Sequence, residues 1–261
     1  MHILDIDLDF FLNRIPSRAS DSEERVANGY IKPWNPEKVQ QFLESRCGLS
    51  KCAPISGRIF NSHHEAFYFW RDLINSGRIK TPFEVTHIDA HADLGLGDMG
   101  WCYICGDILH RPINQRMYPE IGLDRLTYPD IYEMTEGNYL AFAVACRWIN
   151  KITYVTLTER AEDLFQYHFK DNDISSNYLQ LKKYRRELLG HSESGYSFDI
   201  QNGKAAPLDL EPLVRFEAIP FSEYNNSSDV SLIDLSISPK YTPKDSDKLI
   251  PIIEKYIQLD R

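Results

Sequence analysis

A short segment rich in aspartate and histidine, His87-Ile88-Asp89-Ala90-His91-Ala92-Asp93, constrains the fold more than any other part of the chain. It follows a β-prone run, Phe83-Glu84-Val85-Thr86, and precedes a glycine-rich turn. Alternate side chains of a strand share a face, so Asp89, His91 and Asp93 are expected to converge at a strand end. Two carboxylates crowded around one histidine repel each other unless a cation lies between them. The segment therefore predicts a metal site rather than an ordinary exposed strand end.

The first residues carry a second acidic run, Leu4-Asp5-Ile6-Asp7-Leu8-Asp9-Phe10-Phe11. In a strand over residues 2–11, Asp5, Asp7 and Asp9 share one face and the apolar residues between them share the other. Three like charges on one strand face are costly unless cations or water screen them. The run predicts further metal ligands.

A third group of candidate ligands lies in Asn61-Ser62-His63-His64-Glu65, where an apolar stretch gives way to a helical pattern. We expect His63 to bind a metal, with His64 as the alternative ligand; a surface histidine is the simpler interpretation of either. Glu65 also has two interpretations, because Ser62-x-x-Glu65 matches a helix capping box.

The identity of the metal follows from the mixture of ligands. Many carboxylates with one imidazole per ion suit Mn²⁺ better than Zn²⁺, which favours nitrogen and sulfur. The candidate ligands are too numerous for one tetrahedral ion. A site with two Mn²⁺ ions and a hydroxide bridging them as the nucleophile is the economical interpretation.

The run Asp89-Ala90-His91-Ala92-Asp93 resembles the Asp-Ala-His-x-Asp signature of the arginase and agmatinase superfamily. The resemblance implies a three-layer α/β fold with a central, mostly parallel sheet, two Mn²⁺ ions and hydrolysis of guanidinium groups. It also implies that two of the three N-terminal aspartates bridge the metals. The metal ligands are then drawn from Asp5, Asp7, Asp9, His63, Asp89, His91 and Asp93.

Other segments extend the resemblance. Asn61–His64 is similar to the Gly-Gly-Asp-His turn that supplies a metal histidine. Gly106–Pro112 resembles a segment whose histidine shuttles protons, which implies that role for His110; a simple loop histidine is the alternative. Asp234–Pro239 resembles the last strand of the fold.

Two departures bear on the assignment. In arginases the Asp-x-Asp strand follows the Asp-Ala-His-x-Asp strand, whereas here it comes first, so the order of motifs looks circularly permuted. Ser197-Phe198-Asp199-Ile200-Gln201 is a competing placement of that strand, with glutamine in place of the second carboxylate. The glutamate that holds guanidinium in arginases has no match, and Asp234 or Glu65 could supply the carboxylate instead.

The permuted order resembles one divergent branch that includes peptide arginases, which convert arginine side chains of ribosomally made peptides to ornithine and release urea. The expected partner is therefore an arginine-containing peptide, and the long polar segment 13–33 is a possible lid or substrate loop. Three alternatives stay open: a ureohydrolase acting on free arginine or agmatine, a metal-dependent deacetylase-like hydrolase, and a metal-binding protein without catalytic activity.

Composition fits these expectations. A chain of 261 residues, 43% of them hydrophobic, predicts one catalytic domain over residues 1–261. It has no apolar run of membrane-spanning length and no signal-peptide pattern, and its odd number of cysteines, five, predicts a reducing cytoplasm. The net charge of −9 argues against nucleic acid and suits a cationic substrate. The lone pair Cys102-x-x-Cys105 is weak support for zinc.

The expected secondary structure alternates strands and helices. Asn35-Pro36 predicts a helix start, residues 65–76 and 138–147 predict helices, and residues 152–157 and 231–237 predict strands. Such alternation is typical of a parallel sheet with its chemistry at the carboxyl ends of the strands.

Overall fold

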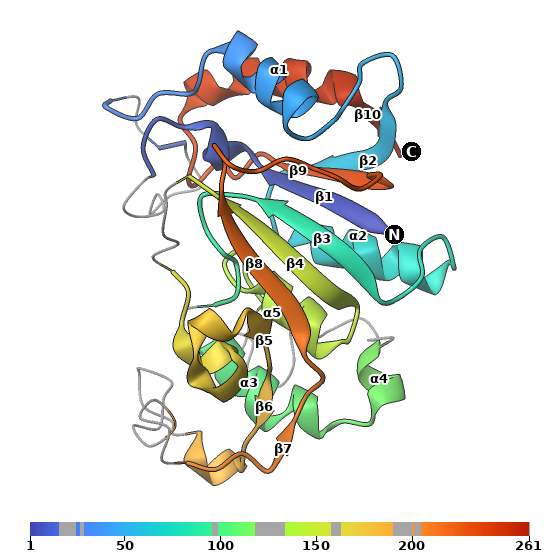
Figure 1. The fold of residues 1–261 in the computed structure, drawn as a ribbon, viewed down its shortest axis with the longest axis vertical. Coiled ribbons are helices and arrows are strands. Elements are labelled where there is room, and N and C mark those ends of the chain that lie inside the picture. Colours follow the sequence, from blue (N-terminus) through green and yellow to red (C-terminus); the bar gives the residue numbers. More distant parts are fainter. Residues whose placement is uncertain are drawn as a thin grey trace.

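Eight strands form one sheet in the order β10-β2-β9-β1-β3-β4-β8-β5, in which every neighbouring pair is parallel except β5 and β8 (Figure 1). The computed structural model describes residues 1–15, 25–26, 29–95, 99–117, 134–157, 163–189, 200 and 205–260. The fold is therefore α/β with a mostly parallel central sheet, as the sequence predicted.

The strands of the sheet are β1 (His2–Asp7), β2 (Ile55–Phe60), β3 (Phe83–Ile88), β4 (Ile149–Thr156), β5 (Tyr178–Leu179), β8 (Val214–Pro220), β9 (Leu232–Ser236) and β10 (Ile257–Leu259). A separate antiparallel pair joins β6 (Lys182–Lys183) and β7 (Asp209–Leu210). The α-helices are α1 (Pro36–Ser45), α2 (Glu65–Asn75), α3 (Met99–Gly106), α4 (Ile113–Met117), α5 (Tyr139–Ala145) and α7 (Ile250–Ile253).

Short 3₁₀ helices complete the described part of the chain. They are η1 (Leu8–Phe11), η2 (Ile108–His110), η3 (Gln166–His168), η4 (Lys170–Asn172), η5 (Ile174–Ser176), η6 (Arg186–Leu188), η7 (Lys244–Leu249) and η8 (Glu254–Tyr256).

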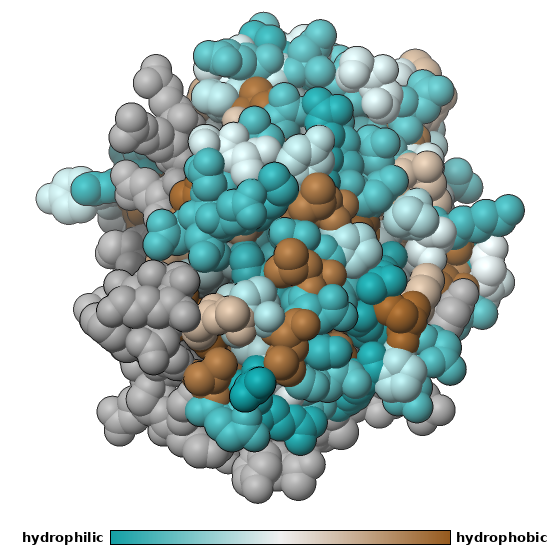
Figure 2. Space-filling view, turned by 60° about the horizontal axis from the view of Figure 1, so that its bottom comes forward, coloured by the Kyte–Doolittle hydropathy of each residue, from teal (hydrophilic) through white to brown (hydrophobic). Residues whose placement is uncertain are grey.

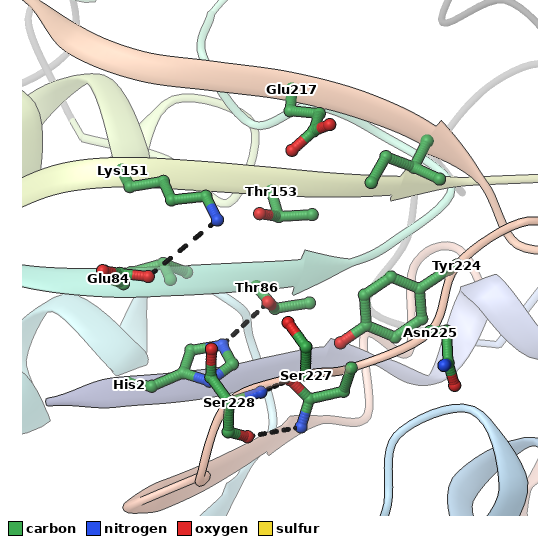
Figure 3. Close-up of a pocket in the computed structure, with 13 residues that line it drawn as sticks. His2, Glu84, Thr86, Lys151, Thr153, Glu217, Tyr224, Asn225, Ser227 and Ser228 are labelled. Atoms are coloured by element: carbon green, nitrogen blue, oxygen red, sulfur yellow. Dashed lines mark hydrogen bonds and ion pairs between the residues drawn. The ribbon is translucent and has the colours of Figure 1, made fainter.

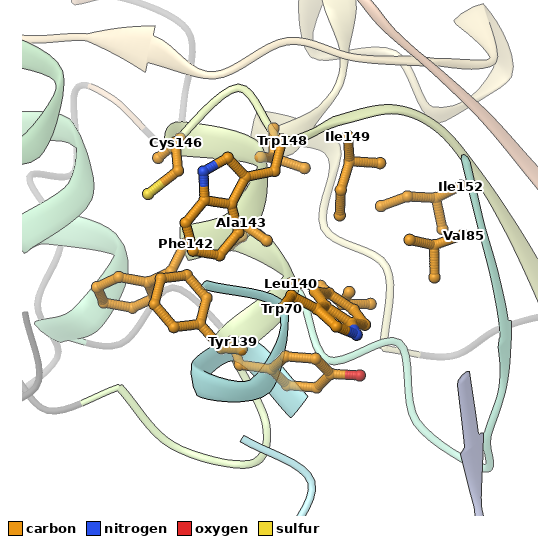
Figure 4. Packing of buried hydrophobic residues seen from close by; sticks show 14 of the residues in the cluster. Trp70, Val85, Tyr139, Leu140, Phe142, Ala143, Cys146, Trp148, Ile149 and Ile152 are labelled. Carbon is orange, nitrogen blue, oxygen red and sulfur yellow. The ribbon is translucent and has the colours of Figure 1, made fainter. Parts of the chain in front are cut away.

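Helices cover both faces of the sheet (Figure 1). One face packs against α2 and α5, where Trp70, Tyr139 and Trp148 belong to one large buried cluster (Figure 4). The other face packs against α1 and α7, where Phe42 and Leu43 meet the apolar side chains of the inner strands. Burial of these apolar surfaces on both sides is the main favourable contribution to stability.

The strand β1 shows how the alternation of its residues fits this architecture. Leu4 and Ile6 belong to the core on the α1 side, whereas Ile3 belongs to the core on the α2 side. Because successive strand residues point to opposite faces, Asp5 and Asp7 face α2 and α5 with Ile3.

Most predicted elements are present, with small changes at their ends. Asn35 accepts a hydrogen bond from the backbone N–H of Glu37 at 2.7 Å, which caps α1 as the sequence predicted. The predicted strand 2–11 is shorter: it ends at Asp7, whose side chain accepts a hydrogen bond from the backbone N–H of Asp9. That bond starts the 3₁₀ turn η1 and lets the chain leave the sheet.

The predicted lid 13–33 lies partly outside the described residues. Its described ends meet, because Leu12 and Pro33 form an antiparallel bridge. Arg25 donates hydrogen bonds to Thr242 and Asp247, in the segment that follows β9. The described part of 13–33 therefore contacts the loop after β9.

Among the described residues, no helix has the length and apolar character that crossing a bilayer requires. The described surface mixes hydrophilic and hydrophobic residues. In Figure 2 the hydrophobic ones gather in the middle and lower part of the view, with hydrophilic ones between them. Several exposed apolar residues flank the outer strands, including Tyr178 next to β8 and Leu210 on β7.

Candidate metal centre

Eight side chains from two strands and the segments that follow three strands meet on the face of the sheet that packs against α2 and α5. They come from the carboxyl ends of β1 and β3, from the residues that follow these strands and from the turn after β2. This edge is where parallel α/β sheets place their ligands. The set, named the Asp/His cluster from here on, consists of Asp5, Asp7, Asp9, His63, His87, Asp89, His91 and Asp93.

His63 occupies the centre of the cluster. Its Nδ1 lies 3.2 Å from Asp7 Oδ2, 2.9 Å from Asp89 Oδ2 and 3.1 Å from Asp93 Oδ2. This nitrogen is buried and makes no hydrogen bond to any described residue. Its other ring nitrogen, Nε2, lies 3.0 Å from Asp5 Oδ1. An unpartnered imidazole nitrogen among three carboxylate oxygens is an arrangement that suits a cation.

His91 lies beside a second group of carboxylates. Its Nδ1 is 3.1 Å from Asp9 Oδ2 and 3.6 Å from Asp89 Oδ1. Asp89 therefore presents one carboxylate oxygen to His63 and the other to His91. The cluster thus contains two groups of ligand atoms that share Asp89.

The loop after β3 brings these residues together in a different way from the predicted strand alternation. The strand ends at Ile88, and Asp89–Asp93 form a tight loop in which Asp93 has a φ of 47°. The backbone N–H of His91 donates to Asp89 Oδ1 at 2.8 Å, and that of Ala90 donates to Asp9 Oδ1 at 3.3 Å. Loop hydrogen bonds, and not the pleat of a strand, set the positions of Asp89, His91 and Asp93.

Asp5 has a different position from Asp7 and Asp9. Its Oδ1 faces His63 Nε2, and its Oδ2 lies 2.9 Å from His87 Nδ1 and accepts a hydrogen bond from the hydroxyl of Tyr139. Both oxygens therefore contact protein groups. A carboxylate bonded to the far nitrogen of a metal-binding histidine fixes the orientation of that ring. This geometry favours Asp7 and Asp9 as the ligands of the N-terminal run and gives Asp5 an orienting role.

His87 belongs to the cluster although the sequence analysis did not select it. It is fully buried on β3, next to Asp5 in the sheet register, and its Nε2 lies 3.0 Å from the carbonyl oxygen of His91 and 3.4 Å from Asp89 Oδ2. His87 is two residues before Asp89, so the alternation used for Asp89, His91 and Asp93 could have included it.

The segment after β9 reaches the cluster through a hydroxyl group. Ser238 has a φ of 44° and donates a hydrogen bond to Asp7 Oδ2, while the Oγ atoms of Ser236 and Ser238 lie 2.9 Å apart. The backbone N–H of Ser238 is fixed by the carbonyl of Asn61 at 2.9 Å. Ser238 thereby helps to orient Asp7.

In the part of the chain that the structure describes, no lysine or arginine pairs with the carboxylates of the cluster. Among the described residues, all ion pairs of its five carboxylates involve histidines. Burial, together with the charges of Asp7 and Asp89, raises the pKa of Asp9, and burial with Asp89 raises the pKa of Asp93 to about 7. Burial opposes the charged form of His87, but Asp5 and Asp89 outweigh it and raise its pKa to about 9.

These shifts mean that the protein alone must hold protons on its histidines and on some carboxylates. A divalent cation can replace those protons and neutralise the carboxylates. In four overlapping triads of the cluster, all three ligand atoms lie within 4.8 Å of one another. The buried Asp/His groups of the described chain could therefore hold a metal ion.

Two of the three predicted catalytic residues, His110 and Glu65, lie away from the cluster. His110 Nε2 contacts the carbonyl oxygen of Tyr184 at 2.8 Å. Glu65 accepts a hydrogen bond from the backbone N–H of Ser62 at 2.9 Å, which is half of the predicted capping box. Neither side chain is brought together with the metal ligands.

Asp234 lies close to the cluster but behind it. It is fully buried on β9, opposite Asp5 in the sheet register, and accepts a hydrogen bond from Trp70 Nε1 at 2.5 Å. Burial and the charge of Asp5 raise the pKa of Asp234 well above its usual value. A carboxyl group closed off in this way cannot reach a substrate without a rearrangement.

The sequence offered two alternatives, His64 as the metal histidine and Ser197–Gln201 as the Asp-x-Asp strand. His64 Nδ1 lies 2.9 Å from Ser62 Oγ and 3.9 Å from Glu136 Oε2, so it points away from the carboxylates around His63. Asp199 lies outside the described residues.

A separate polar pocket of about 100 Å³ lies on the opposite face of β3 (Figure 3). His2 Nε2 lies 2.8 Å from Thr86 Oγ1 there, and Lys151 Nζ lies 4.0 Å from Glu84 Oε2. Thr86 and His87 are consecutive strand residues and point to opposite faces, so this pocket and the Asp/His cluster are separated by the sheet.

Comparison with known proteins gives no assignment, because neither the family models nor the curated proteins match this chain. The metal-binding character of the cluster thus rests on its geometry, its burial and its uncompensated charge.

Proposed function

We propose that the chain is a hydrolase of guanidinium groups that uses two Mn²⁺ ions. The observation that carries the proposal is the shared carboxylate of Asp89, which faces His63 with one oxygen and His91 with the other. The likeness of Asp89–Asp93 to the arginase signature supports the same chemistry. We further propose that it is a peptide arginase with a circularly permuted arginase-like fold. Such an enzyme converts arginine side chains of a precursor peptide to ornithine.

The two groups of ligand atoms favour manganese. One group would comprise His63 Nδ1 with Asp7, Asp89 and Asp93, and the other His91 Nδ1 with Asp9 and Asp89. Each group combines one imidazole with several carboxylates, and no cysteine belongs to either. Hard oxygen ligands of this kind suit Mn²⁺ better than Zn²⁺. When bound, the ions would supply the Lewis acidity that makes water a nucleophile near neutral pH.

The chain's own residues would hold this site in a fixed arrangement. Asp5 would accept a hydrogen bond from His63 Nε2–H, which leaves Nδ1 free to bind a cation. Ser238 and the backbone N–H of Asp9 each bond one oxygen of Asp7. The ligands Asp7, Asp9, His63 and Asp89 are all at most 3% exposed. Low exposure keeps competing water away and strengthens the electrostatic interactions within the site.

The proposed reaction consumes one water per guanidinium group. Water adds to the guanidinium carbon, and the bond from that carbon to the side-chain nitrogen then breaks. The departing nitrogen takes a proton and becomes the ammonium group of ornithine, while the former guanidinium carbon leaves in urea. An acidic cluster near this carbon attracts the cationic substrate.

The proposal is tested by loading the purified protein with manganese, measuring bound metal and incubating it with an arginine-containing peptide. We expect about two Mn²⁺ per chain, release of urea, and loss of CH₂N₂ per modified arginine in the mass spectrum of the peptide. Stoichiometric zinc without any gain in activity from manganese would argue against it. A higher kcat/KM for free arginine than for the peptide would instead favour an ordinary ureohydrolase.

A further inference from the structure

We propose that Glu136 binds the cationic group of the substrate and that Lys240 occupies its place until the substrate arrives. This inference rests on the proposed function, because it assumes a cationic substrate at the Asp/His cluster. It assigns the substrate-holding carboxylate to a residue that the sequence did not single out.

Three segments far apart in the sequence meet around Glu136. His64 stands at the start of α2, Glu136 lies in the turn before α5, and Lys240 follows β9. Glu136 Oε2 lies 3.9 Å from His64 Nδ1, and Glu136 Oε1 lies 3.7 Å from Lys240 Nζ. Both distances exceed a hydrogen bond, so each carboxylate oxygen faces a cationic or polarisable group without being bonded to it.

The turn that carries Glu136 is fixed against the metal-binding loop. The backbone N–H of Gly95 donates to the carbonyl of Gly137 at 2.8 Å, and that of Leu140 donates to the carbonyl of Asp93 at 3.2 Å. These two bonds join residues that closely follow Glu136 to the loop that holds Asp89, His91 and Asp93. Glu136 is therefore held beside the cluster by backbone contacts and does not depend on its own side-chain contacts for its position.

Tyr241, which follows Lys240 in the chain, lies against the second group of ligand atoms. The ring of Tyr241 packs against the imidazole of His91, with 5.3 Å between the ring centroids. His91 is the most accessible member of the cluster, since its side chain is 33% exposed, whereas the side chain of Asp9 beside it is 1% exposed. The exposed member of the cluster, His91, therefore lies against the residue that follows Lys240 in the chain.

Other carboxyl groups near the cluster are less suited to hold a cation. Asp234 is fully buried behind Trp70, and Glu65 caps α2. Asp163 accepts a hydrogen bond from the backbone N–H of Ala92 and so helps to hold the metal-binding loop. Glu136, in contrast, is partly exposed, and its described contacts are the two long ion pairs with His64 and Lys240.

Lys240 is easily displaced from Glu136. Its side chain is 48% exposed and that of Glu136 is 22% exposed, and an exposed pair of this kind contributes little to stability. A guanidinium group presents a planar fork of N–H donors that can bond both oxygens of one carboxylate, which an ammonium group cannot match in geometry. Exchange of Lys240 for the substrate would therefore replace a loose pair by a bidentate one.

The experiment measures binding without turnover. Pentanamidine presents the planar cation of an arginine side chain without the side-chain nitrogen whose bond is broken, and pentanamide is its neutral counterpart of similar shape. Titration calorimetry on the manganese-loaded protein should give at least tenfold tighter binding of pentanamidine, because a hydrogen bond between two charged groups is stronger than one to a neutral amide. Glu136→Gln should reduce this preference to about threefold or less, whereas Lys240→Met should raise it, since the competing cation is gone.

Two controls separate this role from general damage. Glu254→Gln, an exposed glutamate on η8, should keep the wild-type preference, and manganese content should be the same in all variants. The proposal is overturned if the wild-type protein does not distinguish the two probes, or if Glu136→Gln retains the full preference. If the preference for pentanamidine is present but no peptide releases urea, the hydrolase function is refuted and the role of Glu136 in cation binding is not.

Discussion

Two buried groups of charged residues in this chain differ in how their charge is balanced. Glu211 accepts hydrogen bonds from Arg116 at 2.8 Å and from Arg147 at 2.9 Å, so its carboxylate has two cationic partners in the chain. The Asp/His cluster contains five carboxylates, and all their described ion pairs are with histidines. A buried group whose positive and negative charges balance can serve to connect structural elements. A group with excess negative charge requires a cation from outside the chain.

We expect the largest effect from a substitution that removes the shared carboxylate of Asp89. Asp89→Asn removes one charge from both groups of ligand atoms and leaves the glutamate–arginine triad untouched. Turnover of an arginine-containing peptide should fall by about a thousand-fold, which corresponds to ~4 kcal/mol. Bound manganese, measured by elemental analysis, should fall below two ions per chain. Asp209→Asn, on the exposed strand β7, is the matched control and should retain both properties.

Removal of the metal tests whether the negative charge of the Asp/His cluster needs a cation for the folded protein to be stable. A ligand that binds only the folded state adds about 4 kcal/mol per site when its concentration is a thousand times its Kd. Dialysis against a chelator should therefore lower the Tm of the wild-type protein strongly, and manganese should restore it. An unchanged Tm after complete metal removal would mean that the cluster balances its own charge by protonation.

Glu211→Gln should have a smaller effect that is independent of metal. Loss of one partner from a buried ion pair leaves Arg116, whose side chain is 4% exposed, without its counter-charge and costs about 3 kcal/mol. Denaturant unfolding should show this loss equally with and without manganese. Metal content should stay at the wild-type value, and a decrease in it would show that the two groups are coupled.

The smallest effect concerns His168, a buried histidine that has no carboxylate partner within the described ranges. Burial, with the charge of Lys182, lowers its pKa to about 3, and its ring nitrogens bond no described residue. The unfolded chain then binds more protons between pH 3 and 6.5, so stability is full above the unfolded pKa and falls as the pH decreases. At pH 5 the loss is about 2 kcal/mol. Unfolding free energies of His168→Leu at pH 7 and pH 5 should differ by that much less than those of the wild type.

The alternation of side chains allowed much of the cluster to be found from the sequence. Asp5 and Asp7 face the same side of β1 because a strand has a period of two. His87 obeys the same period but lies before the Asp-Ala-His-x-Asp run that carries the family resemblance, so that run does not include it. The spread of Asp89, His91 and Asp93 over a loop was not predictable, since it depends on hydrogen bonds to Asp9 and to Asp163.

Contacts between distant segments were the least predictable part of the site. A carboxylate in a strand pattern, such as Asp234, does not reveal that Trp70 will enclose it from another element. Glu136 stands alone in a polar turn and carries no local signal of its neighbours. Its pairing with Lys240 depends on the position of β9 in the sheet, which the order of residues along the chain does not disclose.

The position of β9 has a consequence for synthesis of the protein on the ribosome. β9 lies between β1 and β2, although it is made after both of them and after β3, β4 and β8. A nascent chain that has not yet extended beyond β8 therefore has unpaired edges on β1 and β2, which are prone to wrong pairing. Asp7 also lacks the hydroxyl of Ser238 at that stage. The metal centre can take its final form only after one of the last strands has been inserted into the middle of the sheet.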